Sequence, residues 1–151
     1  MLYFCYGSNM YTKHLLKYCK QSEFEFIDIG YVKDYIFKFR NIINHKKTGV
    51  GNIEKRKKSK VYGVIFNINT NTAIQKINKK EGMKYNLYEI KTVVVNSITK
   101  NKKYKCTAYI MNEKTKGKET RPTKKYKKIV INGALENKLP SCQIKRYNYL
   151  E

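Results

Sequence analysis

Residues 2–6 constrain the fold of this chain more than any other stretch. Five apolar or aromatic residues follow one another without alternation, and the run stops abruptly at Gly7, Ser8 and Asn9. A stretch that is apolar on both faces predicts a fully buried strand. The small polar residues after it predict a turn into a helix over about residues 10–19, with Asn9 as the N-cap.

The turn itself is a candidate binding site. A turn between a strand and a helix presents unpaired backbone N–H groups beyond the end of the strand, and such groups can bind an anion. Gly7, Ser8 and Asn9 would be the donors, and the missing side chain of Gly7 would let a ligand approach the backbone. On the residues alone, an ordinary capped turn without a ligand stays an open alternative.

Length and composition favour one globular domain. The chain has 151 residues, of which 41% are hydrophobic, so we expect a single domain over 1–151. No apolar run approaches the roughly 20 residues of a membrane-spanning helix. The first apolar stretch is too short for a secretory signal and has no basic leader. We therefore expect a soluble, cytoplasmic protein without membrane association.

The rest of the chain reads as a mixture of strands and helices. Strands are expected over 24–29 and 31–40, separated at Gly30, and then over 60–68, 88–98 and 103–111. Helices are expected over 71–80 and from Pro122 to about Asn137, whereas 41–60 has the composition of a long loop. Gly63 predicts a bulge or a close backbone contact within its strand. The predicted fold class is α+β, built around a strongly curved sheet.

The net charge of +22 is the most unusual compositional feature, and it invites a nucleic-acid interpretation. The lysines are spread along the whole chain, and they accompany the many asparagines that an AT-rich coding sequence favours. No recognised nucleic-acid-binding module is visible. We therefore expect a solvated, lysine-coated surface, with nucleic-acid binding as the less favoured alternative.

The cysteines and histidines do not indicate a metal site. Four cysteines are widely scattered, no two of them are spaced as a Cys-x-x-Cys pair, and only two histidines accompany them. We expect reduced, buried thiols and no bound metal.

Glu81 is the candidate catalytic residue. Ile74, Ile77 and Glu81 share one face of the helix over 71–80, and that face must be buried. The solvent-facing positions are expected to be Gln75, Lys76, Asn78, Lys79 and Lys80. An inward carboxylate is costly, so it indicates a general base. The alternative is a helix-ending glutamate that frays outward, with Gly82 as the left-handed cap.

Four sequence motifs, in this order, resemble those of the γ-glutamylcyclotransferase family. The first is the opening Tyr3-Phe4-Cys5-Tyr6-Gly7-Ser8-Asn9-Met10. The second comprises Gly51-Asn52-Ile53 and Val61-Tyr62-Gly63-Val64, and the third is Ile77-Asn78-Lys79-Lys80-Glu81-Gly82 followed by Tyr88. The last comprises Pro122, Tyr126, Val130, Gly133-Ala134, Glu136-Asn137 and Leu139-Pro140. The chain departs from the family pattern at Asn78, where Asp is usual, and at Gln143, where Tyr is common.

The resemblance implies a fold, an activity and a site. The fold would be a small mixed β-barrel with flanking helices, and the enzyme would release 5-oxoproline from γ-glutamyl amino acids or peptides without a cofactor. Glu81 would be the catalytic acid and base. The substrate would be bound by Tyr3, Phe4, Cys5, Tyr6, Gly7, Ser8, Asn9, Tyr88 and Tyr126. Related enzymes are often dimers, so a homodimer is also expected.

Two alternatives stay open. The same fold could act on γ-glutamylamines or glutathione, although the Tyr-Gly-Ser-Asn opening resembles the glutathione-specific branch less well. A non-catalytic module could instead bind a polyanion through the positive surface, with an affinity that falls steeply with salt.

Overall fold

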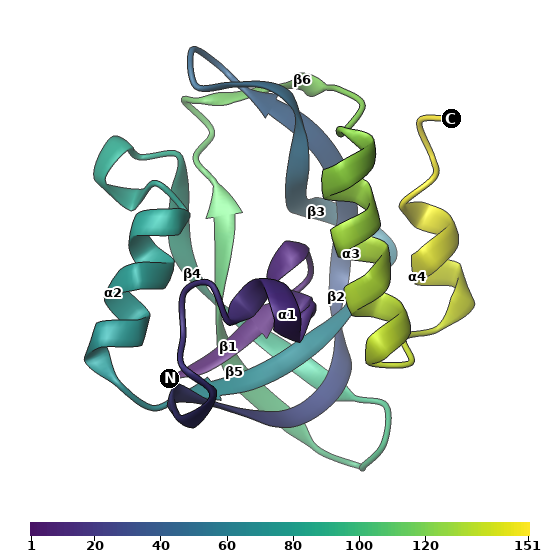
Figure 1. Ribbon diagram of the computed structural model, residues 1–151. Coiled ribbons are helices and arrows are strands. Elements are labelled where there is room, and N and C mark those ends of the chain that lie inside the picture. The colour runs from purple at the N-terminus through teal and green to yellow at the C-terminus, as the bar shows by residue number, and fades with distance from the viewer.

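Five strands close into a barrel in the computed structural model, which describes residues 1–151 (Figure 1). They are β1 (Leu2–Cys5), β2 (Phe24–Ile42), β3 (Lys46–Ile68), β4 (Tyr88–Ser97) and β5 (Lys103–Met111). Their order is β3-β1-β5-β4-β2, and pairing of β2 with β3 closes the barrel. Every pair is antiparallel except β1 with β5. The short strand β6 (Lys116–Glu119) extends the sheet beside the far end of β2. The predicted mixed barrel is confirmed.

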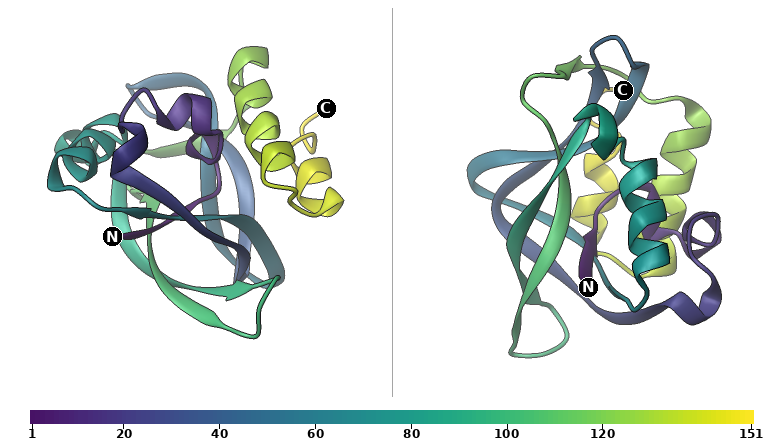
Figure 2. Two further views of the ribbon diagram at one scale, coloured as in Figure 1. Left: turned by 60° about the horizontal axis from the view of Figure 1, so that its bottom comes forward. Right: turned by 90° about the vertical axis from the view of Figure 1, so that its left-hand side faces the viewer.

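Four α-helices flank the barrel, in agreement with the predicted α+β class. They are α1 (Thr12–Leu15), α2 (Asn71–Lys80), α3 (Lys124–Glu136) and α4 (Ser141–Arg146). Three single turns of 3₁₀ helix lie at Ser8–Met10, Gln21–Glu23 and Met83–Tyr85. Helix α2 covers one side of the barrel and α3 with α4 covers the other, with α1 between them (Figures 1 and 2). None of the helices combines the length and the apolar composition that crossing a membrane requires.

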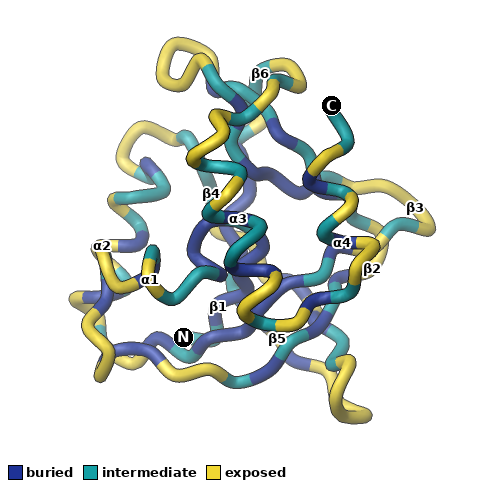
Figure 3. Tube along the Cα trace, turned by 45° about the vertical axis from the view of Figure 1, so that its right-hand side comes forward, coloured by how far each residue is buried: buried dark blue, intermediate teal, exposed yellow.

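Strand β1 runs through the interior of the molecule, which accounts for its continuous apolar sequence. It pairs with β3 on one side and with β5 on the other, and Phe4 is completely buried. Figure 3 shows this segment as mostly buried, whereas exposed residues lie at hairpin ends, in loops and on the helices. A strand with buried neighbours on both faces and both edges favours apolar and aromatic side chains at every position.

Gly63 lies where β3 passes close to β1, and the predicted close backbone contact is confirmed. A Cβ atom at this position would lie 2.3 Å from the carbonyl oxygen of Cys5. Gly30 has a similar role, because a Cβ there would lie 2.5 Å from the carbonyl oxygen of Asn96. Gly30 lies inside the continuous strand β2, where it pairs with Gly63, so the predicted break between 24–29 and 31–40 is wrong.

Residues 41–60, expected to be a loop, form the ends of two paired strands instead. Pairing of β2 with β3 extends from Phe24 and Ile68 to Ile42 and Lys46, so the connecting turn takes only 43–45. The prediction was wrong because glycine, asparagine and lysine disfavour strands and because the register shifts interrupt the alternation. Pairing along the whole hairpin stabilises these residues as strands.

The helix expected over 10–19 is much shorter than predicted. Only the single turn at Ser8–Met10 and the four residues of α1 are helical, and Tyr11 rather than Asn9 is the N-cap of α1. The side chain of Asn9 is instead buried and donates to the hydroxyl of Tyr3 over 2.9 Å. Asn9 therefore orients its side chain toward β1, where a cavity opens.

Candidate active site

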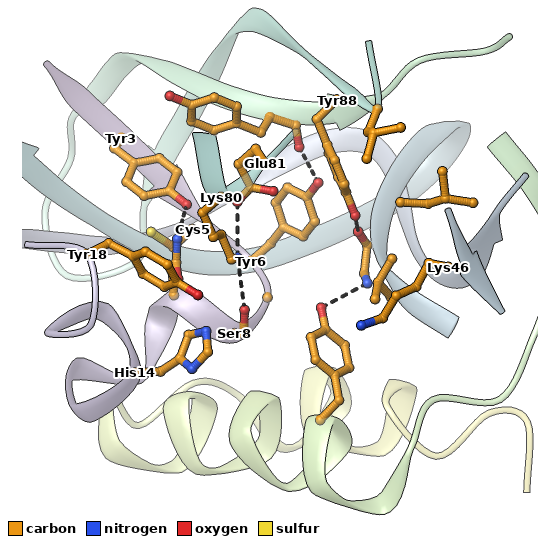
Figure 4. Close-up of a pocket in the computed structure, with 18 of the residues that line it drawn as sticks. Tyr3, Cys5, Tyr6, Ser8, His14, Tyr18, Lys46, Lys80, Glu81 and Tyr88 are labelled. Atoms are coloured by element: carbon orange, nitrogen blue, oxygen red, sulfur yellow. Dashed lines mark hydrogen bonds and ion pairs between the residues drawn. The ribbon is translucent and has the colours of Figure 1, made fainter. Parts of the chain in front are cut away.

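One cavity of about 360 Å³ collects all ten residues that the sequence singled out (Figure 4). It opens between the end of β1, the end of α2, the β2–β3 hairpin and α3. The predicted residues that line it are Tyr3, Phe4, Cys5, Tyr6, Gly7, Ser8, Asn9, Glu81, Tyr88 and Tyr126. These positions lie as far apart in sequence as β1 and α3, so only the closed barrel brings them together.

The turn after β1 forms one side of the cavity. The backbone N–H groups of Gly7, Ser8 and Asn9 donate to no other residue of the protein. Gly7 has φ −122° and ψ −139°, so it does not adopt the left-handed conformation that favours glycine. A Cβ atom at Gly7 would point toward the hydroxyl of Tyr126, 3.6 Å away. The missing side chain therefore leaves space in the cavity beside three free donors.

Helix α2 delivers Glu81 to the opposite side. The N-cap of the helix is Thr70, whose side chain accepts from the backbone N–H of Ala73 over 3.2 Å, and Glu81 is its C-cap. Gly82 follows in the left-handed conformation, with φ 65°, as the alternative interpretation of this segment expected. The carboxylate does not fray outward, however, because its side chain is 11% exposed and lines the cavity.

Lys80 lies in the cavity too, and its predicted solvent-facing position is wrong. Its Nζ atom lies 3.2 Å from Oε1 of Glu81 and donates to Oγ of Ser8 over 3.2 Å (Figure 4). Burial alone would lower the pKa of Lys80, but the adjacent Glu81 carboxylate outweighs it and raises this pKa above its usual value. Lys80 is thus a permanent cation that joins the Glu81 side of the cavity to the turn after β1.

Two tyrosines close the cavity by binding the same backbone unit of β3. The N–H of Gly51 donates to the hydroxyl of Tyr126 over 3.0 Å, and the hydroxyl of Tyr88 donates to the carbonyl oxygen of Gly51 over 2.7 Å. Burial raises the pKa of both phenols, so both stay neutral. Helix α3 positions Tyr126 through its N-cap, Thr123, whose hydroxyl accepts from the N–H of Tyr126 over 3.1 Å.

Comparison with known proteins shows which family has this arrangement. A family model described as the AIG2-like family matches residues 60–146, which is more than half of the chain. The chain belongs to the AIG2-like family. The match in this AIG2-like chain includes Glu81, Tyr88 and Tyr126, but it does not include β1 and the turn after it.

Longer comparisons cover β1 and the turn as well. The AIG2-like chain is 29% identical to a γ-glutamylcyclotransferase of Bos taurus over 154 residues, which cover 99% of this chain and 78% of the relative. It is 29% identical to the γ-glutamylcyclotransferase of Homo sapiens, over 92% of this chain and 72% of the relative. A solved structure named γ-glutamyl cyclotransferase superposes with a TM-score of 0.88 at 25% identity, over 100% of this chain and 88% of the other.

Ten further residues line the cavity of this AIG2-like chain that the sequence did not predict as site residues. They are His14, Tyr18, Ile42, His45, Lys46, Val50, Gly51, Lys80, Leu87 and Tyr109. Tyr109 explains how the chain accommodates Asn78 in place of the usual Asp. Its hydroxyl donates to Oδ1 of Asn78, and a neutral amide oxygen accepts this bond as a carboxylate would.

His14 is a neutral group in the wall of the cavity. Burial, with smaller contributions from Lys80 and Lys17, lowers its pKa from 6.5 to about 4. Its Nδ1 atom is buried without a hydrogen-bond partner. No three side chains of His, Cys, Asp or Glu converge anywhere in the structure in a group that could hold a metal ion.

Proposed function

We propose that this chain is a γ-glutamylcyclotransferase that converts γ-glutamyl amino acids or peptides into 5-oxoproline and the free amino acid or peptide. One observation carries the proposal: a carboxylate, Glu81, lies in a cavity whose other side is the donor-rich turn Gly7–Asn9. The names of the relatives, which match over nearly the whole chain, support it.

The proposed reaction is intramolecular. The α-amine of the γ-glutamyl group attacks its own γ-carbonyl carbon, a new C–N bond closes a five-membered lactam, and the bond from that carbon to the acceptor amine breaks. One proton leaves the attacking amine and one reaches the leaving amine, so neither water nor a cofactor is consumed. Because the substrate carries both reacting groups, the protein has to fold it, stabilise charge and move protons.

Different residues of the cavity bind the substrate, stabilise charge and transfer protons. The free N–H groups of Gly7, Ser8 and Asn9 bind the glutamyl group and stabilise the oxyanion that develops on the γ-carbonyl. Glu81 accepts the proton of the attacking amine and returns it to the leaving amine. Lys80 orients the Glu81 carboxylate, because it binds that carboxylate and Ser8 at once. The phenols of Tyr88 and Tyr126 form the polar wall against which the substrate folds.

The proposal is tested by incubating the purified protein with γ-glutamyl-alanine, glutathione and a γ-glutamylamine side by side. We expect 5-oxoproline and an equal amount of alanine from γ-glutamyl-alanine. Faster release from glutathione or from the γ-glutamylamine would assign the fold to one of these alternative substrates. Absence of 5-oxoproline with all three would contradict the enzymatic function.

Tyr126→Phe is expected to affect both stability and binding. The buried N–H of Gly51 would lose its acceptor, which costs about 1–3 kcal/mol of the free energy of unfolding. KM for γ-glutamyl-alanine should rise as well, because Tyr126 lines the cavity and its hydroxyl lies beside Gly7, 3.6 Å from where a Cβ atom would be. Urea denaturation and steady-state kinetics measure the two effects. Tyr85→Phe, at an exposed position, is the control that should change neither. A change in stability alone would make Tyr126 a structural residue.

We propose that the enzyme is cytoplasmic and dimeric. All four cysteines are free, which suits the reducing cytoplasm, but Cys142 is exposed, so the prediction of buried thiols is wrong for this residue. We propose a homodimer in solution, which light scattering would report as twice the mass of the chain.

We propose no nucleic-acid partner, although the net charge is +22. Binding of an unrelated oligonucleotide that survives 0.5 M salt would contradict this part.

A further inference from the structure

One cation in the wall of the cavity has no function in the proposed reaction. Lys46 is the first residue of β3, directly after the hairpin turn; it is exposed and lines the cavity. No ion pair of the structure involves it. Figure 4 shows Lys46 across the cavity from Ser8 and Lys80. The cavity therefore has one ammonium group paired with Glu81 and a second one that is free.

The charges that line the cavity leave an excess of one positive charge. Glu81 is the single carboxylate of the lining, and Lys80 neutralises it. His14 is neutral, since its pKa is lowered to about 4. His45, beside Lys46, is exposed and contacts the ring of Tyr85. A cavity with one unpaired ammonium favours a ligand that brings one carboxylate more than it brings ammonium groups.

The candidate substrates differ in this respect. A γ-glutamyl amino acid has two carboxylates and one ammonium, whereas a γ-glutamylamine lacks the carboxylate on the acceptor. The glutamyl group has to lie beside Glu81 and the turn, which Lys80 already bridges, so the acceptor is directed to the rest of the cavity wall. That wall is formed by Ile42, Lys46 and Val50 of the hairpin and by Leu87, so it offers apolar contacts and one cation.

We propose that Lys46 is a specificity-determining residue that binds the carboxylate of the acceptor amino acid. This inference rests on the proposed cyclotransferase function. It makes the chain selective for γ-glutamyl amino acids and peptides over γ-glutamylamines. Lys46 acts on binding of the acceptor and not on proton transfer, because it lies across the cavity from Lys80, which holds Glu81.

The test compares two substrates that differ only in the acceptor carboxylate, γ-glutamyl-alanine and γ-glutamyl-alaninamide. In Lys46→Met we expect KM for γ-glutamyl-alanine to rise about fivefold to tenfold, with kcat little changed. The constants for the alaninamide should stay within about twofold of those of the unaltered protein. Lys46→Glu should go further and reverse the preference, so that the alaninamide becomes the better substrate.

Lys47→Met is the matched control. Lys47 is the next residue of the same strand, is exposed and does not line the cavity, so neither substrate should be affected. Equal losses for both substrates in Lys46→Met, or no loss for either, would overturn the role of Lys46 while leaving the cyclotransferase function in place. No turnover of either substrate by the unaltered protein would overturn the proposed function, and this inference with it.

Discussion

Glu81→Gln is expected to lower kcat for γ-glutamyl-alanine by about 10² to 10⁴-fold while the protein stays folded. Glutamine has nearly the same shape, and its amide oxygen still accepts the hydrogen bond from Nζ of Lys80. The replacement removes the ability to take a proton from the attacking amine and to deliver it to the leaving amine, together with the negative charge that pairs with Lys80. Circular dichroism and the melting temperature should be close to those of the unaltered protein.

The measurement for this variant is the rate of 5-oxoproline release at saturating substrate. Glu113→Gln is the matched control, because Glu113 is an exposed carboxylate that does not line the cavity and should leave the rate unchanged. An undiminished rate in Glu81→Gln would remove this residue from the mechanism. A large loss accompanied by unfolding would show instead that Glu81 has a structural role.

Gly63→Ala is expected to destabilise the protein by about 2–3 kcal/mol, because overpacking an interior costs this much. The added methyl group would lie 2.3 Å from the carbonyl oxygen of Cys5 and 2.8 Å from the ring of Phe4. The first of these atoms belongs to the backbone of β1, so relief requires β1 and β3 to separate. Because β1 ends in the turn Gly7–Asn9, the site should be distorted together with the barrel.

Urea denaturation measures this destabilisation. Gly7→Ala is the control for stability, because its new methyl group would meet no atom closer than the hydroxyl of Tyr126 at 3.6 Å. We expect its free energy of unfolding to stay within about 0.5 kcal/mol of the original. If Gly63→Ala were as stable as Gly7→Ala, the close approach of β1 and β3 would not be the reason for glycine at position 63.

The parts of the fold that the sequence predicts well are those in which local pattern and tertiary context agree. Residues 2–6 are apolar because β1 is paired on both edges and packed on both faces. The apolar run therefore predicts the buried strand without any information on the rest of the fold. The buried face of α2, which contains Ile77, is equally predictable from the sequence, because a helix with one buried face has to repeat its apolar residues at helical spacing. Glu81 could be found by the same spacing.

Other parts depend on partners that are remote in the sequence. Residues 41–60 contain lysine, glycine and asparagine and become strand only because β2 lies alongside. That error concealed the wall of the cavity formed by Ile42, Lys46 and Val50. The prediction that Lys80 faces solvent was wrong because helical spacing gives the side of the helix on which a residue lies, but not which parts of the fold pack against that side. Its partners are its neighbour Glu81 and Ser8, 72 residues away in the sequence.

The central claim is that the cavity makes a γ-glutamyl group cyclise on itself. The most direct test is the identity of the product when γ-glutamyl-alanine is turned over in water enriched in ¹⁸O, followed by mass spectrometry. The account predicts alanine and an equal amount of 5-oxoproline without ¹⁸O, because no water takes part in the reaction. Glutamate that carries ¹⁸O in its γ-carboxylate would contradict it, because that product requires attack by water in place of the α-amine.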